Sequence, residues 1–170
     1  GLSVTVLDNL IYGQTSLLDL CSNEKFSFVK GDITDDLLIK KLVCEHDIVV
    51  PLAAIVGAPA CANNPALAKL INSDAPLRML KRLSNEQMVL FPTTNSGYGI
   101  GTKGVLCDEN SPLRPLSEYA RAKVELENAF LQKGNAVTFR LATVFGMSPR
   151  MRTDLLVNDF VVRAMKDKSI

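Results

Sequence analysis

The sequence has only one histidine and four cysteines in 170 residues, and this scarcity excludes several kinds of active site. With His46 as the only histidine, neither a serine–histidine triad nor a multi-histidine metal site can form, and we expect His46 on the surface before a strand. The cysteines contain no CxxC pair of the kind that zinc sites use, and a secreted disulfide scaffold would be shorter and richer in cysteine. We therefore predict no metal ion, and free thiols in a reducing cytoplasm.

An excess of charge of one sign is also lacking, as are long apolar runs. The chain has 19 Lys and Arg against 18 Asp and Glu, and its net charge of +1 provides no field that would steer it toward nucleic acid or an anionic membrane. No unbroken apolar run is long enough to span a bilayer, and the first residues do not read as a signal peptide. We expect a cytoplasmic protein with neither a membrane nor a nucleic acid as its partner.

The sequence does contain an alternation of two patterns. Short apolar, β-branched runs recur at 4–7, 26–29, 47–50, 88–91 and 136–141. Such near-continuous hydrophobicity is typical of parallel strands that are buried on both faces. Apolar residues at helical spacing occupy the segments 34–42, 65–83, 117–132 and 153–165. Strands that alternate with helices predict an α/β fold with a doubly wound parallel sheet of the Rossmann type.

The most informative motif is Tyr119-Ala-Arg-Ala-Lys123, in the third predicted helix. A spacing of four residues places both side chains on one helix face, about one turn apart. A lysine cation near a phenol favours the phenolate and lowers the tyrosine pKa from about 10, so that the tyrosine can exchange a proton with an alcohol or carbonyl near neutral pH. An exposed helix can also carry this spacing by chance, so the motif needs support from its surroundings.

Polar residues at the ends of predicted strands supply that support, because ligands of open parallel sheets bind at the carboxyl ends of strands. Thr93 and Thr94 lie at such an end, where a threonine hydroxyl could hold the reacting oxygen or cap a turn. Asp8 closes the first strand and suits the adenosine ribose of NAD while repelling the 2′-phosphate of NADP, although Asp-Asn also favours a turn. Asp32 follows the second strand as another acid or as a helix cap. The segment 52–54 offers small side chains, so a flat cofactor could lie close to its backbone.

The segment 96–116 is rich in glycine and proline and predicts a long loop, which in a compact domain is usually functional. Its stretch Gly-Ile-Gly-Thr-Lys-Gly at 99–104 fits the GxGxxG expression, but no helical pattern follows that could bind a phosphate, so we reject that reading. Farther along the chain, Arg150 and Arg152 could clamp phosphate oxygens or form an ordinary solvated pair.

Taken in order, six segments resemble the extended short-chain dehydrogenase/reductases, the NAD-dependent epimerase/dehydratase family, of the UDP-galactose 4-epimerase type. These segments are VTVLDNL, VKGDITD, DIVVPLAAIVG, FPTTNSGYG, EYARAKVELE and FRLATVFGMSPRMRTDLLVND. The catalytic residues that the resemblance implies are Thr94, Tyr119 and Lys123. The positions that it implies for contact with NAD are Asp8, Asn9, Asp32, Ile33, Leu52, Ala53, Ala54, Asn72, Thr93, Tyr119 and Lys123. The positions that it implies for contact with a sugar nucleotide are Thr94, Asn95, Ser96, Thr143 and Asn158.

The activity that the resemblance implies is the epimerisation of a nucleotide-activated sugar. Enzymes of this type take a hydride from the sugar onto tightly held NAD and return it after the keto intermediate has turned. Asn95 and Ser96 stand where similar sugar 4,6-dehydratases carry a pair of acids, so the elimination of water lacks its agents and epimerisation is favoured. A dehydratase or reductase of the same family and a non-catalytic NAD(H)-binding relative stay open as alternatives.

The resemblance also implies a homodimer, formed through a four-helix bundle of the helices at 65–83 and 117–132. Apolar faces around Leu77, Leu80, Leu126 and Phe130 would line that interface.

The family pattern is incomplete at both ends of this sequence. Gly1 aligns just before the family's second strand, so we expect the first βα unit, with its glycine-rich phosphate-binding turn, and most of the substrate domain to be missing. We expect an NAD-binding domain at 1–150 and the start of a substrate-binding region at 151–170, and we expect this piece to be inactive alone. Pro51 ends the third predicted strand and removes one hydrogen-bond donor from its ladder.

Overall fold

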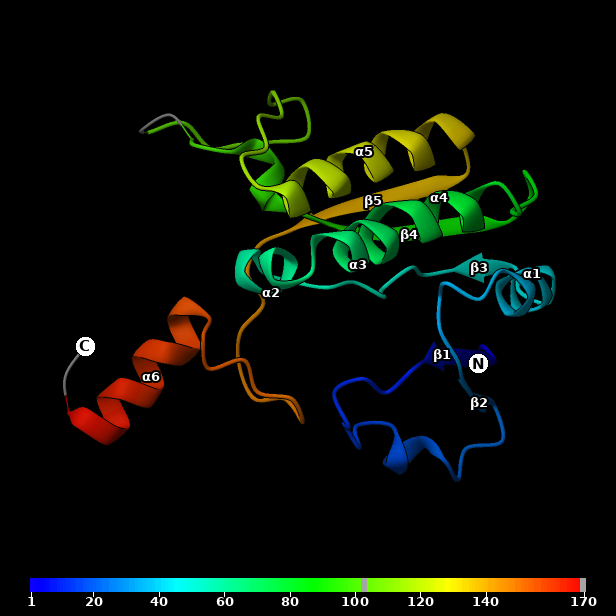
Figure 1. Cartoon of the computed structure of the whole chain (residues 1–170), viewed down its shortest axis with the longest axis horizontal. Helices are drawn as coiled ribbons and strands as arrows, with labels where there is room; N and C mark the ends of the chain where they lie inside the picture. The colour runs from blue at the N-terminus through cyan, green and yellow to red at the C-terminus, as the bar shows by residue number, and fades with distance from the viewer. Residues whose placement is uncertain (102–103, 169–170) are drawn as a thin grey trace. The chain divides into compact units, whose positions relative to one another are not determined.

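The structure is a computed structural model that describes residues 1–101 and 104–168 (Figure 1). Helices alternate with parallel strands, which confirms the predicted α/β class. The strands are β1 (Val4–Asp8), β2 (Phe26–Lys30), β3 (Ile48–Val49), β4 (Met88–Thr94) and β5 (Ala136–Leu141). The α-helices are α1 (Asp36–Cys44), α2 (Ala58–Asn63), α3 (Pro65–Lys69), α4 (Ala75–Leu80), α5 (Glu118–Lys133) and α6 (Leu156–Asp167). Two 3-10 helices, η1 (Leu18–Leu20) and η3 (Asn95–Tyr98), and one π-helix, η2 (Leu70–Asp74), are also formed.

The chain divides into two compact units, each with its own parallel sheet. The terminal unit comprises Gly1–Lys30 and Thr143–Ile170, and the central unit comprises Gly31–Ala142. In the terminal unit β1 pairs with β2, and in the central unit the strand order is β3-β4-β5. The expected domain boundary at residue 150 stays a prediction.

Strand β3 is shorter than the predicted strand at 47–50. It pairs with β4 only through its residues Ile48 and Val49 and ends before Pro51, which has no N–H to donate. Beyond Val89, the described pairing of β4 is with β5. One side of β4 therefore needs no backbone donor at Pro92, and this explains how a proline fits inside the strand.

Capping side chains determine where helices α1 and α5 begin. The carboxylate of Asp35 accepts hydrogen bonds from two backbone N–H groups of the first turn of α1, both at 3.0 Å. The hydroxyl of Ser117 accepts a hydrogen bond from the N–H of Ala120 at 3.1 Å, at the start of α5. Helix α5 ends at Gly134, whose φ of +80° lies in the region that favours glycine. The predicted helices at 34–42 and 117–132 are thus confirmed.

The predicted helix at 65–83 is helical but not uniform. Pro76 has no N–H and cannot bond the carbonyl four residues earlier, and the chain widens into the π-helix η2 just before it. There the N–H of Ala75 donates to the carbonyl of Leu70, five residues back. The spacing of apolar residues did not predict α2, whose sequence Ala-Pro-Ala-Cys-Ala-Asn contains no large apolar side chain. Helix α6 begins at Leu156, three residues later than expected.

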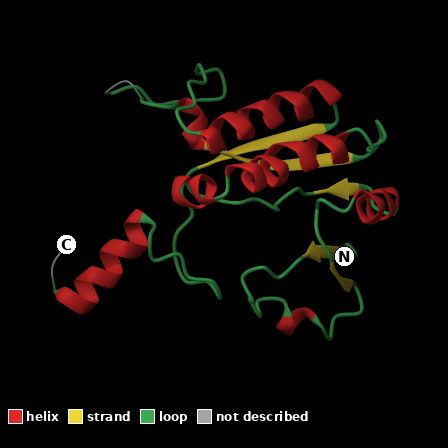
Figure 2. Cartoon of the chain, viewed as in Figure 1, coloured by secondary structure: helices red, strands yellow, loops and turns green. Residues whose placement is uncertain are grey.

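The core of the central unit lies between β4 and helix α5, which packs beside α4 (Figure 2). Val89 and Phe91 of β4 and Leu126 and Phe130 of α5 are almost completely buried, and the rings of Phe91 and Phe130 are 4.8 Å apart. Leu126 and Phe130 are therefore core residues, and the prediction that they line a dimer interface is wrong.

Candidate active site

The three strands of the central unit bring predicted site residues to one edge of their sheet. Strands β3, β4 and β5 are parallel neighbours, so their carboxyl ends meet at the same edge. The segment 52–54 follows β3, and Thr93 and Thr94 end β4. Leu52 and Ala53 are exposed and Ala54 is half-buried, so a flat ligand can approach this backbone.

Lys123 is held on the buried face of α5. It is only 5% exposed, and its ammonium Nζ lies 4.6 Å from the centroid of the Phe91 ring and 5.9 Å from that of the Tyr119 ring. Its hydrogen bond to the carbonyl of Pro92 is long, at 3.4 Å. Burial lowers the pKa of Lys123 from 10.5 to about 8, because the charged form loses its hydration. A buried ammonium with one weak protein bond is well placed to contact a ligand.

Tyr119 lies one turn before Lys123, as the spacing predicts, but its pKa shifts in the opposite direction from that expected. Burial raises the pKa of Tyr119 above 10, and the nearby thiol of Cys61 raises it further. The lowering expected from Lys123 does not outweigh burial, because Lys123, with a pKa of about 8, has lost its charge before the phenol titrates. In this state Tyr119 is a protonated phenol, which can donate a proton.

The two threonines at the end of β4 point to opposite faces of the sheet, since side chains alternate along a strand. The Oγ1 of Thr94 accepts a hydrogen bond from the N–H of Ser96 at 3.1 Å, which caps η3 and leaves the hydroxyl proton available to another acceptor. Thr93 is 6% exposed, and its Oγ1 is buried without a hydrogen-bond partner. Asn95 and Ser96, in η3, are exposed.

Asn72 uses its side chain to hold the backbone after the segment 52–54. Its Oδ1 accepts from the N–H of Ile55 at 2.8 Å, and its Nδ2 donates to the carbonyl of Ile55 at 2.9 Å. The thiol of Cys61 donates to the same carbonyl at 3.4 Å. Asn72 is 3% exposed and lies in η2. The amide thus positions a backbone segment, and its predicted direct contact with a cofactor stays a prediction.

Asp8, Asn9 and Asp32, which were predicted to contact NAD, form local turns. The Oδ1 of Asp8 accepts from the N–H of Leu10 at 2.6 Å, and the Oδ1 of Asn9 accepts from the N–H of Ile11 at 3.0 Å. The Oδ1 of Asp32 accepts from both the N–H and the hydroxyl of Thr34, at 2.9 and 2.8 Å. The turn chemistry considered for Asp8 is therefore present. Ile33, next to Asp32, is half-buried.

The predicted sugar-nucleotide residues of the terminal unit differ in exposure. Thr143 is exposed, whereas Asn158 is 4% exposed. The Oδ1 of Asn158 accepts from the N–H of Gly146 at 3.1 Å, and its Nδ2 donates to the carbonyl of Arg152 at 2.9 Å. Asn158 therefore holds the loop that precedes α6.

Both arginines that the sequence suggested for phosphate already have protein partners. Arg152 makes two hydrogen bonds of 2.7 Å to the carboxylate of Asp154. The guanidinium carbon of Arg150 lies 3.3 Å from the centroid of the Tyr12 ring. The glycine stretch 99–104 is described only in part, because residues 102 and 103 lie outside the described residues. No helix forms in the described segment 104–116.

Sequence analysis missed a cluster around Arg140, on β5. Arg140 pairs with Glu127 of α5 and also contacts Tyr98. Glu127 raises the pKa of Arg140 above its usual range, through their hydrogen bond. A signal was present in the sequence, since an arginine inside the apolar run Val-Thr-Phe-Arg-Leu needs a buried partner. Glu127 lies four residues after Lys123, on the same helix face.

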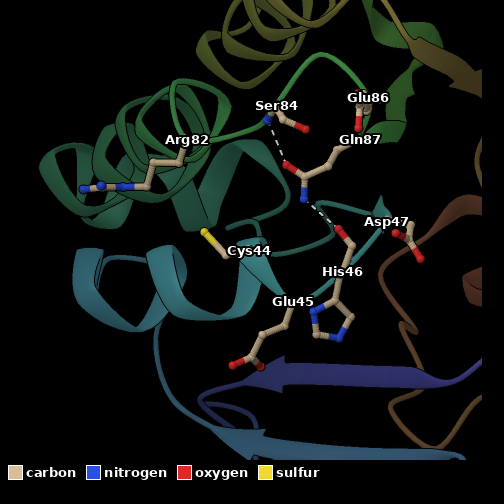
Figure 3. Close-up of a pocket in the computed structure, with 8 residues that line it drawn as sticks. All are labelled: Cys44, Glu45, His46, Asp47, Arg82, Ser84, Glu86 and Gln87. Carbon is tan, nitrogen blue, oxygen red and sulfur yellow. Dashed lines mark hydrogen bonds between the residues drawn. The ribbon is translucent and has the colours of Figure 1, made fainter.

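A cavity of about 410 Å³ lies near the amino ends of β3 and β4, away from the candidate site (Figure 3). The Nε2 of Gln87 donates to the carbonyls of Val43 and His46, both at 2.6 Å, and its Oε1 accepts from the N–H of Ser84 at 2.8 Å. His46 is half-buried, and its Nδ1 lies 2.7 Å from the carbonyl of Leu42. Because ligands of parallel sheets bind at the carboxyl ends, we assign no function to this cavity.

In residues 1–101 and 104–168, no group of three or more His, Cys, Asp or Glu side chains could hold a metal ion. No helix in the part of the chain that the structure describes is long and apolar enough to cross a membrane.

Comparison with known proteins gives consistent matches. The model of the NAD dependent epimerase/dehydratase family matches residues 1–169. The chain is 32% identical over 127 residues to a dTDP-glucose 4,6-dehydratase of Streptomyces niveus, which covers 72% of this chain and 38% of that protein. It is 26% identical over 154 residues to a UDP-glucose 4-epimerase of Lactobacillus helveticus, which covers 87% of this chain and 45% of that protein. The chain thus spans about half the length, or less, of the curated relatives that it matches.

A solved structure gives the same result for the fold. The UDP-N-acetylglucosamine 4-epimerase of Methanobrevibacter ruminantium, solved with UDP-N-acetylmuramic acid, has a TM-score of 0.79 at 25% identity, over 98% of this chain and 56% of that chain. These matches confirm the predicted family, its Rossmann-type fold and NAD as the cofactor of the family. Dehydratases and epimerases both occur among them, so they do not choose between the two reactions.

Proposed function

Because the chain belongs to the NAD-dependent epimerase/dehydratase family, we propose that it forms the cofactor-binding part of a nucleotide-sugar epimerase. One observation carries the proposal. Tyr119 and Lys123 lie one turn apart on α5, which packs against the strand that ends in Thr94, all within the central unit. An acid–base group, a cation and a hydroxyl can together move a proton on and off the oxygen of an alcohol, which its reversible oxidation by a hydride acceptor requires.

The residues of the central unit fit NAD. The Oγ1 of Thr93 is a buried hydroxyl without a partner, and the ammonium of Lys123 has one long hydrogen bond. A hydrogen bond to a polar ligand would stabilise both the hydroxyl and the ammonium. When bound, NAD would take a hydride from a sugar carbon and later return it. Within the central unit we assign Asp32 to the ribose end of the cofactor and the backbone of 52–54 to its flat surface, and within the terminal unit we assign Asp8 to a ribose.

Tyr119 is the proposed acid–base residue. Its proton passes to the sugar oxygen when the carbonyl is reduced, and returns to Tyr119 when the alcohol is oxidised. The ammonium of Lys123 favours the phenolate form, which takes up the proton when the alcohol is oxidised. A ligand that draws the ammonium toward the ring would strengthen this effect. Thr94 would donate its hydroxyl proton to the same sugar oxygen.

Epimerisation is proposed over dehydration because of Asn95 and Ser96. Removal of water from a sugar needs one group to take a proton and another to protonate the leaving hydroxyl. An amide and a hydroxyl serve poorly in those roles, but they suit hydrogen bonds to a sugar that must turn within the site. A dehydratase is the second candidate, since a dehydratase is among the curated relatives above 30% identity.

A nucleotide-activated sugar is the proposed substrate, contacted by Thr94, Asn95 and Ser96 and, in the terminal unit, by Thr143 and Asn158. A homodimer in the cytoplasm is the proposed form of the complete protein, with an interface that does not include Leu126 and Phe130, which are buried in the core.

Product analysis of the complete protein tests the proposed function. The protein is incubated with UDP- and dTDP-linked hexoses, and the products are separated and their masses measured. We expect an epimer with the mass of the substrate and no net change in the redox state of NAD. A product lighter by one water would make the protein a dehydratase, and net oxidation of NADH would make it a reductase.

A further inference from the structure

A buried ion pair links α5, which carries Tyr119 and Lys123, to β5, the strand that pairs with β4 up to Thr94. The Nε and Nη2 of Arg140, on β5, each lie 2.8 Å from the Oε1 of Glu127, on α5. The side chain of Glu127 is 3% exposed and that of Arg140 is 17% exposed. Removing two charges from water costs about as much as their attraction returns, so stability alone does not explain such a pair.

The remaining nitrogen of Arg140 binds the loop that follows β4. Its Nη1 donates to the hydroxyl of Tyr98 at 3.2 Å and to the carbonyl of Glu109 at 3.0 Å. The hydroxyl of Tyr98 in turn donates to the carbonyl of Asp108 at 2.9 Å. The guanidinium therefore connects α5, η3 and the described loop segment 104–116 at one point.

Three residues of this cluster lie close to proposed site residues, either in sequence or in strand register. Tyr98 follows Thr94 by four residues, and Glu127 follows Lys123 by four residues on α5. Arg140 is the register partner of Thr93 on the neighbouring strand. A displacement of the guanidinium would therefore shift the end of β4 relative to α5.

We propose that Arg140 is a positioning residue, which fixes the end of β4 and the segment 104–116 against α5 and so sets the separation between Thr94 and Tyr119. The inference rests on the proposed function. Arg140 and its partner Glu127 act through other residues and touch neither substrate nor cofactor.

The first test compares Arg140→Lys with a matched control in the complete protein. Lysine keeps the charge beside Glu127 but lacks the planar fork that reaches Tyr98 and Glu109 together. Because a misplacement of about 1 Å can cost about 100-fold in rate, we expect kcat to fall roughly 10- to 100-fold, with little change in the KM for the sugar nucleotide. Tyr98→Phe should lower kcat less. Arg78→Lys, in the ion pair of α4 with Asp36 of α1, should leave kcat unchanged.

The second test does not depend on turnover. Hydrogen–deuterium exchange is measured over the backbone amides of 94–99 and 104–116. We expect faster exchange there in Arg140→Lys and Tyr98→Phe, but not in Arg78→Lys, and unchanged exchange in α4. Unchanged exchange in both Arg140→Lys and Tyr98→Phe would overturn the proposal. Faster exchange in Arg140→Lys together with a wild-type kcat would also overturn it. If the wild-type protein turns over no nucleotide sugar, the proposed function fails, and the exchange result alone then decides whether Arg140 anchors the loop.

Discussion

The central and terminal units differ in what holds them together. Among the described residues, every buried apolar side chain belongs to the central unit, whereas the one buried residue of the terminal unit is the polar Asn158. Phe145 and Phe160, both in the terminal unit, are 63% and 41% exposed. The proposed catalytic residues thus rest on a packed core, which can hold their geometry before any ligand arrives.

Unlike the proposed catalytic residues, some of the residues proposed to hold the ribose and the sugar nucleotide lie in the terminal unit. Asp8, Asn9, Thr143 and Asn158 belong to the terminal unit, which is organised by hydrogen bonds rather than by an apolar core of its own. Changes in the central unit should therefore affect stability and chemistry, whereas changes in the terminal unit should affect binding.

The largest expected effect is that of Tyr119→Phe, in the central unit. The ring and its packing remain, but the acid–base group is lost, so turnover of the complete protein should fall by about 10²- to 10⁴-fold. NAD affinity, measured by calorimetry, should change little. Retention of more than half of the wild-type turnover would refute the catalytic assignment.

A pair of truncations compares the stability of the two units. Phe130→Ala removes a fully buried ring from the central core and should lower the free energy of unfolding by about 3 to 5 kcal/mol. Phe160→Ala removes a ring of α6 that is 41% exposed and should change it by less than about 0.5 kcal/mol. Urea denaturation measures both values, and equal losses would contradict the difference drawn between the units.

Lys123→Met separates stability from function within the central unit. The folded-state pKa of about 8 lies below the ordinary 10.5, so the buried ammonium destabilises the fold below pH 8, and this cost disappears as the pH rises to 10.5. The variant should be more stable at pH 7 by up to about 3 kcal/mol, with the gain vanishing by pH 10.5. The kcat of the variant should fall, and its affinity for NAD should decrease. Thermal unfolding of both proteins at a series of pH values measures the difference in stability. If the advantage of the variant grows with pH, the buried ammonium does not destabilise the fold.

The smallest expected effect is that of Asp8→Asn, in the terminal unit. Loss of a charged hydrogen bond to the ribose, worth about 1.5 kcal/mol, should weaken NAD binding about tenfold while leaving turnover at saturating NAD unchanged. The preference for NAD over NADP should narrow, because the carboxylate no longer repels a 2′-phosphate. Calorimetric titration with both cofactors measures this, and an unchanged preference would show that Asp8 does not select the cofactor.

Local patterns in the sequence predicted much of the fold. The apolar runs and the capping residues Asp35 and Ser117 set the strands and the helices α1 and α5 within a few residues. The π-helix η2 was not predictable from apolar spacing, because its wider turn depends on a missing donor at Pro76 and on the bonds of Asn72 to Ile55. Such long-range contacts leave little trace in local patterns.

The candidate site was predictable in its residue types but not in its electrostatics. The spacing of Tyr119 and Lys123 predicts a shared helix face. The direction in which the pKa of Tyr119 shifts, however, depends on burial and on Cys61, which lies 58 positions earlier in the chain. The arginine inside an apolar run predicts a buried partner for Arg140, but it does not predict Tyr98 and Glu109, which are more than 30 residues away in sequence.

The most direct test of the central claim follows the hydrogen that the sugar gives up. The complete protein is incubated with a UDP- or dTDP-hexose that carries deuterium at C4, and the product is examined by NMR and mass spectrometry. If the hydride passes to NAD and returns within one site, the epimer should keep its deuterium at C4 and its full mass. Loss of the label to solvent, or a product lacking the elements of water, would contradict epimerisation by hydride transfer to NAD and back.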